Sequence, residues 1–342
     1  MKFRINNNIK GKKKLQMAAL VLLTPVVLLL CWQLYIPKVL AKSPSVVYSV
    51  QKGTGNDTIA NDLANQGIIK SAAFFKWYVV LSGNSAKLQA GMYSLSPSMS
   101  IASIVKKLVT GGFIKDNITV LEGWDARDIA KYLESKKVYS KKEFLAAIDH
   151  DFSREFDILK DKPKDASLEG YLFPDTYQVS LGEMPEDVLK NMVANLERKL
   201  TPELRVEITS QHKSVFEVIT MASIIEKEVK KTDDKKVVAG ILWKRLANNM
   251  PLQVDATINY ITDKNDPSVS IKDTRIDSRY NTYKYVGLPA GPISNPGMDS
   301  ILAAMYPKES PYWYYLSADR TGKTIFSKTL EDHQLAMAKY LR

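Results

Sequence analysis

The chain has 342 residues, of which 45% are hydrophobic and 25% are charged, and it carries a formal net charge of +11. Six basic residues lie in the first fourteen positions, and the remaining 42 basic against 37 acidic residues are too diffuse an excess for a nucleic-acid-binding surface. The only cysteine, Cys31, excludes a disulfide framework and a cysteine-based zinc site.

Residues 1–16 form a basic tail without an acidic residue, and residues 17–36 are twenty residues without a charge. Twenty helical residues span roughly the 30 Å of a bilayer core, and the positive-inside rule keeps the basic tail in the cytoplasm. We therefore expect a single-pass protein of the inner (cytoplasmic) membrane, with all later residues periplasmic or extracytoplasmic. A signal sequence cleaved at the small-residue site 39–41 is the alternative.

A sequence pattern recurs seventy residues apart and predicts a small αβ domain over residues 45–150. The recurring residues are Gly53, Ile59, Ala60, Leu63, Ile68 and Phe74, which return as Gly123, Ile129, Ala130, Leu133, Val138 and Phe144. In each copy a β-prone run, 47–50 or 118–121, precedes a glycine turn and an amphipathic helix, and residues 92–108 repeat the pattern loosely. Such units resemble LysM modules, which bind N-acetylglucosamine-containing glycans; a plain packing domain is the alternative.

The region 151–342 holds the densest motifs and reads as a mixed, helix-rich domain. Residues 168–177 form an aromatic loop around a Pro-Asp turn, and residues 287–297 form a loop that three prolines and three glycines make rigid. The apolar periods predict helices over 186–200, from Val215 to about Glu228, over 237–248 and within 252–260, and strands over 176–179 and 312–317. The sequence thus predicts an α+β protein with one N-terminal transmembrane helix, a small LysM-like domain and a larger helix-rich domain.

Glu226 stands out because it continues an apolar helical stripe. Val215, Ile219 and Ala222 lie on one helix face, and the next step of four residues reaches Glu226. An acid in apolar surroundings resists ionisation, and a protonated carboxyl group is what acid-assisted cleavage of a glycosidic bond needs. An exposed charge cluster at the helix end is the alternative interpretation.

Six segments follow one another along the chain: LEGYLFPDTY, MASIIEKE, WKRL, LQVDAT, YNTY and GLPAGPISNPG. In these segments and their order, the chain resembles the MltG (YceG-like) family of endolytic murein transglycosylases from Val47 to Arg342. Departures are Ala256 and Ala290, where the family often has proline, and Thr324, where many members have histidine.

The resemblance implies that residues 151–342 are a YceG-like catalytic domain in which Glu226, and not Glu228, is the catalytic acid. It would protonate the β-1,4 bond between N-acetylmuramic acid and N-acetylglucosamine in nascent strands and then serve as base for the muramyl C6 hydroxyl. The product would carry a 1,6-anhydro end. The resemblance implies no metal and no other cofactor. The expected partners are peptidoglycan glycan strands, cell-wall synthases and the membrane, and nucleic acid is not expected as a partner.

The transglycosylase interpretation also predicts which side chains hold the substrate. Polar candidates for the sugar amide and hydroxyls are Gln253, Asp255, Asn281 and Tyr283. Aromatic candidates for stacking on sugar rings are Tyr171, Phe173 and Tyr177. Each of these residues has an alternative role in the core or in a loop.

Other chemistries lack support in the sequence. The chain has no H-E-x-x-H, G-x-S-x-G, P-loop or G-x-G-x-x-G motif, and His150, His212 and His333 lie far apart. The competing hypothesis is a non-catalytic glycan-binding scaffold for wall-synthesis enzymes, in which Glu226 is only structural.

Overall fold

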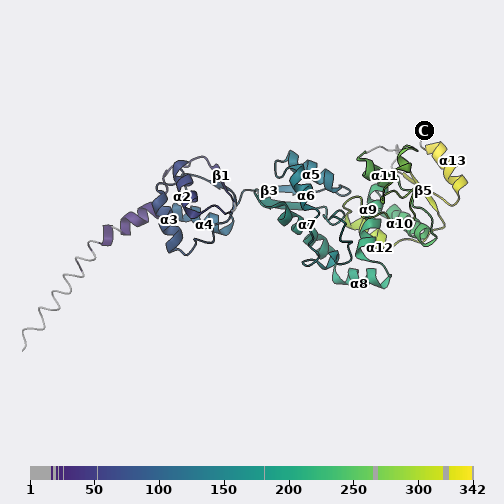
Figure 1. The fold of residues 1–342 in the computed structure, drawn as a ribbon, viewed down its shortest axis with the longest axis horizontal. Helices are drawn as coiled ribbons and strands as arrows, with labels where there is room; N and C mark the ends of the chain where they lie inside the picture. The colour runs from purple at the N-terminus through teal and green to yellow at the C-terminus, as the bar shows by residue number, and fades with distance from the viewer. Residues whose placement is uncertain are drawn as a thin grey trace, which may run out of the picture. The chain divides into compact units, whose positions relative to one another are not determined.

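The structure is a computed structural model that describes residues 17, 21, 23–25, 27–51, 53–180, 182–264, 269–318 and 323–340. The chain divides into two compact units (Figure 1): residues 1–116 with 179–183, and residues 117–178 with 184–342. The sequence placed the corresponding boundary near residue 150. The structure places it near residue 116, within strand β3 (Lys115–Thr119).

The predicted basic tail, residues 1–16, lies outside the described residues, and so does part of the predicted membrane helix 17–36. Residues 27–35 are helical. Among the residues that the structure describes, no helix combines the length and the apolar character needed to cross a membrane.

The first unit is built on two antiparallel strands, β1 (Val46–Val50) and β2 (Gly91–Leu95), paired from Val46 opposite Leu95 to Val50 opposite Gly91. Buried and more exposed residues alternate along β2, because one face of the pair packs on the core. Helices α2 (Asn56–Asn65), α3 (Ala72–Leu81) and α4 (Ile101–Thr110) complete the unit.

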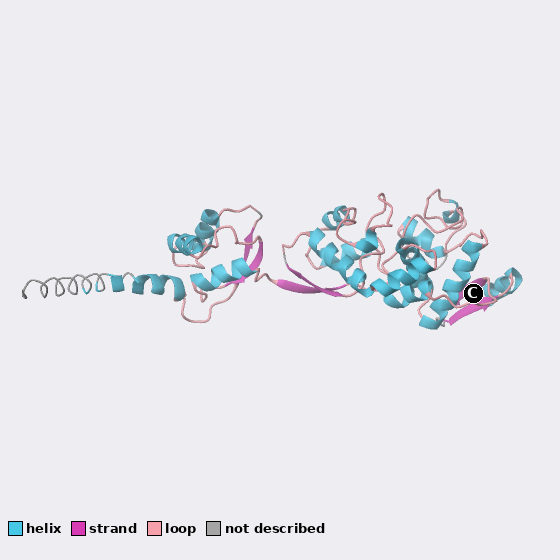
Figure 2. Ribbon diagram, turned by 90° about the horizontal axis from the view of Figure 1, so that it is seen from below, coloured by secondary structure: helices cyan, strands magenta, loops and turns pink. Residues whose placement is uncertain are grey.

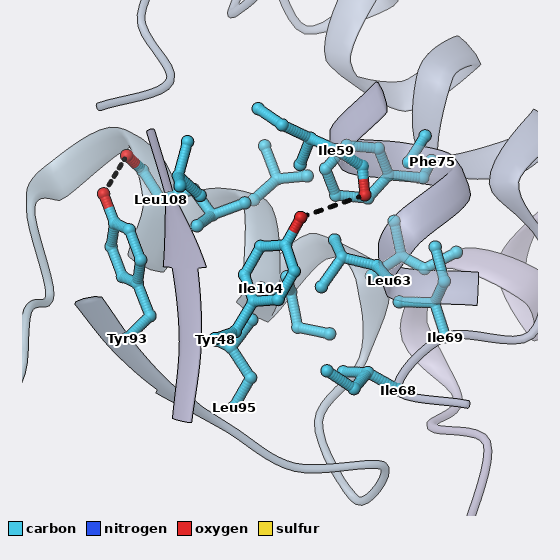
Figure 3. Packing of buried hydrophobic residues seen from close by; sticks show 14 of the residues in the cluster. Tyr48, Ile59, Leu63, Ile68, Ile69, Phe75, Tyr93, Leu95, Ile104 and Leu108 are labelled. Carbon is cyan, nitrogen blue, oxygen red and sulfur yellow. Dashed lines mark hydrogen bonds between the residues drawn. The ribbon is translucent and has the colours of Figure 1, made fainter. Parts of the chain in front are cut away.

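The core of this unit contains aromatic residues whose hydroxyl groups are satisfied by backbone carbonyls (Figure 3). Tyr48 donates to the Ile59 carbonyl at 3.4 Å, and Tyr93 donates to the Gln89 carbonyl at 2.6 Å, with the Leu108 carbonyl as a second acceptor at 3.3 Å. Burial without these bonds would leave the hydroxyls unpaired at a cost of about 1–3 kcal/mol each. The core therefore joins strands and helices through both apolar contacts and hydrogen bonds.

The second unit begins with the second copy of the repeat. It contains α5 (Ala126–Ser135), α6 (Lys141–Ala147) and the larger parts of β3 and of β4 (Thr176–Ser180), two strands that pair with each other. The two glycine turns correspond, since Gly53 and Gly123 both have left-handed backbones, with φ of 85° and 77°. The repeat is thus a strand, a turn and two helices, and its two copies fall mainly in different units.

The remaining helices and strands of the second unit lie between residues 157 and 340. They are α7 (Pro185–Lys199), α8 (Pro202–Ser210), α9 (Val215–Glu228), α10 (Thr232–Ala247), α11 (Asp255–Thr262), α12 (Met298–Met305), β5 (Tyr314–Ala318), β6 (Lys323–Ser327) and α13 (Leu330–Tyr340), with short 3₁₀ turns at Asp157–Leu159 and Asp273–Arg275. The predicted α9 and α7 agree closely with the structure. Helix α10 begins five residues earlier than predicted, β3 is shifted by two to three residues, and β5 by one to two.

Helix α9 is the centre of the second unit and contacts α8, α10, α11 and α12. It begins with a capping box, in which Ser214 and Glu217 satisfy each other's backbone N–H groups. Every residue from 218 to 225 is buried. A helix that is apolar on all sides belongs in a core, so the single stripe predicted from the sequence understates how deeply α9 lies.

The structure confirms a mixed α+β fold that is rich in helix (Figure 2). Over the described ranges, the strands form three separate two-stranded sheets, β1–β2, β3–β4 and β5–β6. The membrane helix and the LysM-like character of residues 45–150 stay predictions.

Candidate active site

Glu226 lies near the C-terminal end of α9, where α9 packs against α10 and α12. One carboxylate oxygen, Oε1, is 3.1 Å from Nζ of Lys235 in α10. The other, Oε2, accepts hydrogen bonds from the Gly297 N–H at 2.9 Å and from the Ser300 hydroxyl at 2.7 Å. The Glu226 side chain is 9% exposed and that of Lys235 is 5% exposed, so this ion pair is almost fully buried from solvent.

The N-terminus of α12 supplies two of these three contacts. Gly297 is the N-cap residue of α12 and Ser300 lies in its first turn. The N-terminal end of a helix carries unpaired N–H groups and a partial positive charge, so it stabilises a negative group placed there. Together with Lys235, it gives Glu226 surroundings that favour negative charge.

The surroundings of the Glu226 carboxyl differ from the apolar environment that the sequence predicted. Ile219 and Ala222 of the stripe are buried as expected. The carboxyl itself, however, faces three hydrogen-bond donors. An ionised carboxylate can accept from all three, whereas a protonated one must turn its O–H toward a donor.

A second carboxyl group, that of Glu122, lies beside this site. Its Oε1 would be 2.1 Å from a Cβ atom built on Gly297, so it packs directly against the residue that donates to Glu226. The pKa of Glu122 is raised, first by burial and then by the charge of Glu226 and of Asp299, while Lys235 acts in the opposite direction. The residue as a whole is nevertheless exposed.

Asn295 joins three segments that are far apart in sequence. Its Nδ2 donates to the Trp124 carbonyl at 3.0 Å and to Oε1 of Glu169 at 2.9 Å, and its Oδ1 accepts from the Leu172 N–H at 2.9 Å. Its backbone carbonyl accepts from the Gly123 N–H at 2.9 Å. The motifs 168–177 and 287–297 thus meet the glycine turn of the second repeat at one buried amide.

The loop 287–297 is also bound directly to α9. Ser223 of α9 accepts from the Ile293 N–H at 3.0 Å, and its carbonyl accepts from the Ser294 hydroxyl at 3.1 Å. On the other side, Gly170 has a φ of +87°, and a Cβ there would lie 2.5 Å from Pro292. The loop is therefore fixed on both sides, and this fixes the Gly297 N–H that contacts Glu226.

Glu169 is a buried acid of this unit. It is 4% exposed, and burial raises its pKa to about 8. It accepts from the Ala126 N–H, at the start of α5, at 2.9 Å and from Asn295. These contacts give Glu169 a structural role between α5 and the loop 287–297.

Glu228, two residues beyond Glu226, belongs to a different group of side chains. Burial raises its pKa to about 7, and it forms hydrogen bonds with the Tyr315 side chain and the Ala256 backbone. The charges of Asp255 and Arg245 act on it. The Tyr283 hydroxyl donates to Asp255, so the structure brings these two predicted substrate-binding residues together. The charge of Glu228 acts on Tyr283, which places this pair near Glu228.

The other two polar candidates are placed differently. Gln253 is exposed, with a φ of +54°. Asn281 is 1% exposed; its Nδ2 donates to the carbonyls of Thr274 and Ile276, and its Oδ1 accepts from the Tyr283 N–H. Since the Asn281 amide is used within its own loop, its position favours a structural role.

The three aromatic candidates lie in the core. Tyr171, Phe173 and Tyr177 are 0%, 6% and 9% exposed, and Tyr177 donates to the Phe173 carbonyl at 2.5 Å. A ring needs an open face to stack on a sugar, and these rings are enclosed by protein. Their aromatic spacing in the sequence reflects packing of the 168–177 loop in this structure.

A cavity of about 310 Å³ offers aromatic surface elsewhere in the unit. Its lining residues are Ala126, Arg127, Leu145, Ile148, Ser167, Glu169, Tyr260, Ile261, Ser278 and Tyr280. The rings of Tyr260 and Tyr280 lie 5.1 Å apart, and the Arg127 guanidinium lies 4.7 Å from the centre of the Tyr260 ring. A smaller hollow is also lined by Arg127 and Tyr260, and by Lys227, the residue that follows Glu226.

Sequence reasoning missed Glu122, Lys235 and Ser300. Glu122 directly precedes Gly123, the glycine of the repeat. This neighbour is the only local sequence signal that Glu122 lies at a fixed turn. Lys235 and Ser300 stand in the first turns of α10 and α12, where nothing in the sequence indicates that they face α9.

Within the described ranges, no cluster of three or more His, Cys, Asp or Glu side chains is arranged to hold a metal ion.

Comparison with known proteins gives consistent matches over most of the chain. The model of the YceG-like family matches residues 48–339. The endolytic murein transglycosylase of Bacillus subtilis (strain 168) is 36% identical over 310 residues, which cover 87% of this chain and 85% of that protein. The endolytic murein transglycosylase of Streptococcus pneumoniae serotype 2 (strain D39 / NCTC 7466) is 31% identical over 323 residues, covering 86% of this chain and 58% of that protein.

A solved structure matches as well. The crystal structure of a yceG-like protein from Listeria monocytogenes is similar with a TM-score of 0.59 and 35% sequence identity. The match covers 86% of this chain and all of that chain.

Proposed function

The chain belongs to the YceG-like family, and from this membership we propose that it is a lytic transglycosylase that cleaves within peptidoglycan glycan strands. The observation that carries the proposal is the Glu226 carboxyl, held between Lys235 and the N-terminus of α12. Curated relatives named endolytic murein transglycosylases at 31% and 36% identity support the same activity.

The proposed reaction breaks the β-1,4 bond between N-acetylmuramic acid and N-acetylglucosamine without water. Glu226 protonates the glycosidic oxygen while positive charge develops at the muramyl C1. The ionised carboxyl then accepts the proton of the muramyl C6 hydroxyl, whose oxygen bonds to C1. Because the nucleophile belongs to the substrate, this step gains from proximity and leaves a 1,6-anhydro end.

The contacts of Glu226 suit the second half of this cycle. Once Glu226 has given up its proton, Lys235, the Gly297 N–H and Ser300 are already in place to stabilise the negative charge. Donors that are fixed before the reaction stabilise charge without reorganisation at the moment of bond cleavage. Their fixed positions follow from the packing of α9, α10 and α12.

For substrate contacts, we keep Gln253, Asp255 and Tyr283 as polar candidates and add Tyr260 and Tyr280 as ring-stacking candidates. The last two are only partly buried and line a cavity, unlike Tyr171, Phe173 and Tyr177. Sugar rings commonly meet partly exposed aromatic faces together with nearby polar groups.

We further propose that residues 17–36 anchor the protein in the cytoplasmic membrane, with residues 1–16 inside and the later residues outside. The uncharged run and the basic tail support this arrangement. Residues 45–150 would bind glycan as LysM-like units, and cell-wall synthases would be partners because the substrate is a nascent strand close to the membrane.

The test is the Glu226→Gln variant of the full-length protein in detergent, incubated with purified glycan strands. We expect release of 1,6-anhydro ends, measured by mass spectrometry, to fall by about 10²–10⁴-fold, because Gln cannot donate an acidic proton. Glu309→Gln removes an exposed carboxyl and serves as the control. Unchanged activity of Glu226→Gln would favour the scaffold hypothesis, and products heavier by one water would indicate hydrolysis.

A further inference from the structure

We propose that helix α3 of the first unit lies on the lipid bilayer and gives this unit a second membrane contact beside the anchor. The inference rests on the membrane anchor proposed above for residues 17–36. The partner is a phospholipid surface that carries anionic headgroups.

Helix α3 presents an apolar stripe to the outside of the first unit. Trp77, Val80 and Leu81 are 63%, 64% and 73% exposed. Together with exposed Ala73 they follow one another at steps of four, three and one, which places them on one helix face, here called the α3 face. Phe75, on the opposite side of α3, points into the core (Figure 3). An outward helix face is normally polar, so an exposed apolar stripe marks a contact surface.

The end of the proposed membrane segment is bound to this unit beside α3. Leu34 packs against the core of the unit. Nζ of Lys70, just before α3, donates to the Trp32 carbonyl at 3.3 Å and lies 4.0 Å from the centre of the Trp32 ring. The side chains of Tyr35 and Tyr78 form a hydrogen bond. These contacts fix α3 next to the last turns of the segment.

The α3 face borders these contacts. Leu81 follows Tyr78 by three residues, so the two are neighbours on the surface of α3. On the segment, Trp32 and Tyr35 remain 49% and 60% exposed although they contact the unit. The exposed aromatic residues of the segment and the α3 face therefore adjoin, and a bilayer that surrounds the segment meets both.

The residue types around this surface suit the region where lipid meets water. Tryptophan and tyrosine are enriched there because their rings are apolar and their N–H and O–H groups are polar. Lys38 and Lys42 follow the segment, and Lys70 lies against the Trp32 ring. The first acidic residue of the chain is Asp57, so the lysines near the segment lie in a stretch without negative charge. This charge complements anionic headgroups, to which lysines reach while their stems lie on apolar surface.

The test places a nitroxide spin label on the full-length protein in vesicles of equal parts phosphatidylcholine and phosphatidylglycerol. The labelled variants are Val80→Cys and, as matched control, Ser103→Cys at an exposed polar position of α4, each combined with Cys31→Ala. Electron paramagnetic resonance measures collisions with a water-soluble nickel chelate and with oxygen. A polar reagent is depleted from apolar surroundings, so nickel collisions at Val80 should be at least about tenfold fewer than at Ser103, while oxygen collisions stay frequent.

Two results would overturn the inference. One is nickel access at Val80 equal to that at Ser103. The other is a Val80 label that neither reagent reaches, because this would show that protein, such as a second copy of the chain, covers the α3 face.

A second variant tests whether the apolar side chains hold α3 at the bilayer. Trp77→Ser with Leu81→Ser, in the protein labelled at Val80, should raise nickel access to the level of Ser103. Both side chains are exposed, so the core of the unit is unaffected. Val206→Ser removes an equally exposed apolar side chain from α8 and should change nothing. Continued protection of Val80 in the double variant would contradict the proposed contact.

The native cysteine separates the possible failures. A label on Cys31 of the otherwise unchanged protein reports on the segment 17–36. Cys31 in lipid with Val80 in water would refute the α3 contact alone, whereas Cys31 in water would refute the anchor and this inference together. Release of anhydro ends by the same protein tests the transglycosylase function, and its absence would leave the result from the labels unchanged.

Discussion

Lys235 holds the central position among the charged residues of the site. It is 4% exposed and forms its ion pair with Glu226 across the contact of α9 and α10. Its charge also acts on Glu122. A buried charge without a partner is costly, so the buried position of Lys235 depends on its ion pair with Glu226.

Lys235→Met is expected to weaken both folding and activity. It leaves the Glu226 carboxylate without its cation, and removal of one partner from a buried pair costs about 3–5 kcal/mol. Denaturant unfolding should show a loss of this order, and release of anhydro ends should fall about 10²-fold as Glu226 shifts.

Lys230→Met, at an exposed position just before α10, is the matched control. Equal stability and activity of Lys235→Met and wild type would show that the ion pair contributes neither to folding nor to the reaction.

At the scale of elements, α10 is positioned by a close backbone contact. Gly240 lies in the middle of α10, and a Cβ there would be 2.1 Å from the Lys308 carbonyl oxygen. The Lys308 N–H donates to the Lys236 carbonyl, and Trp243 donates to the Ala304 carbonyl at the end of α12. These contacts of α10 with Lys308 and with the end of α12 therefore fix the positions in which α10 and α12 pack against α9.

Gly240→Ala tests this packing. In an exposed helix the change would stabilise by up to about 1 kcal/mol, but here the methyl group meets a backbone carbonyl that cannot move aside cheaply. We expect the free energy of unfolding to drop by about 1–3 kcal/mol. Gly55→Ala, at the N-cap of α2 where a Cβ meets nothing within 4 Å, is the comparison without a steric contact. Stabilisation by Gly240→Ala in the unfolding curve would contradict the close contact.

At the scale of the whole molecule, the chain contains two units with separate cores. The core of the first is formed by residues between Tyr48 and Leu108, and the site lies entirely in the second. Chains with two cores commonly depart from two-state unfolding. The repeat was duplicated in sequence, yet its copies contribute to different units.

Leu63→Ala should therefore affect one transition only. Leu63 is fully buried in α2, and such a truncation costs about 2–5 kcal/mol. Calorimetry should show one midpoint lowered by roughly 10 °C or more and the other unchanged. Val80→Ala, on the exposed face of α3, should move neither. A single transition that shifts as a whole would mean that the two units unfold together.

The sequence alone determined the helices α7 and α9, the repeat and the family resemblance, and it gave the prediction of Glu226 as the catalytic acid, because each depends on residue order and on local periodicity. It also identified the 287–297 loop, whose prolines and glycines restrict the backbone whatever surrounds them.

Only the tertiary structure decided what surrounds these residues. Helical periodicity marks the buried face of α9 but cannot say that Lys235 and Ser300, on other helices, meet its carboxyl. Likewise, the sequence cannot distinguish the enclosed ring of Tyr171 from the partly exposed ring of Tyr260. The physical reason is that charge, access and hydrogen bonding at a site come from side chains brought together across long sequence separations, as Glu122, Glu226 and Gly297 are here.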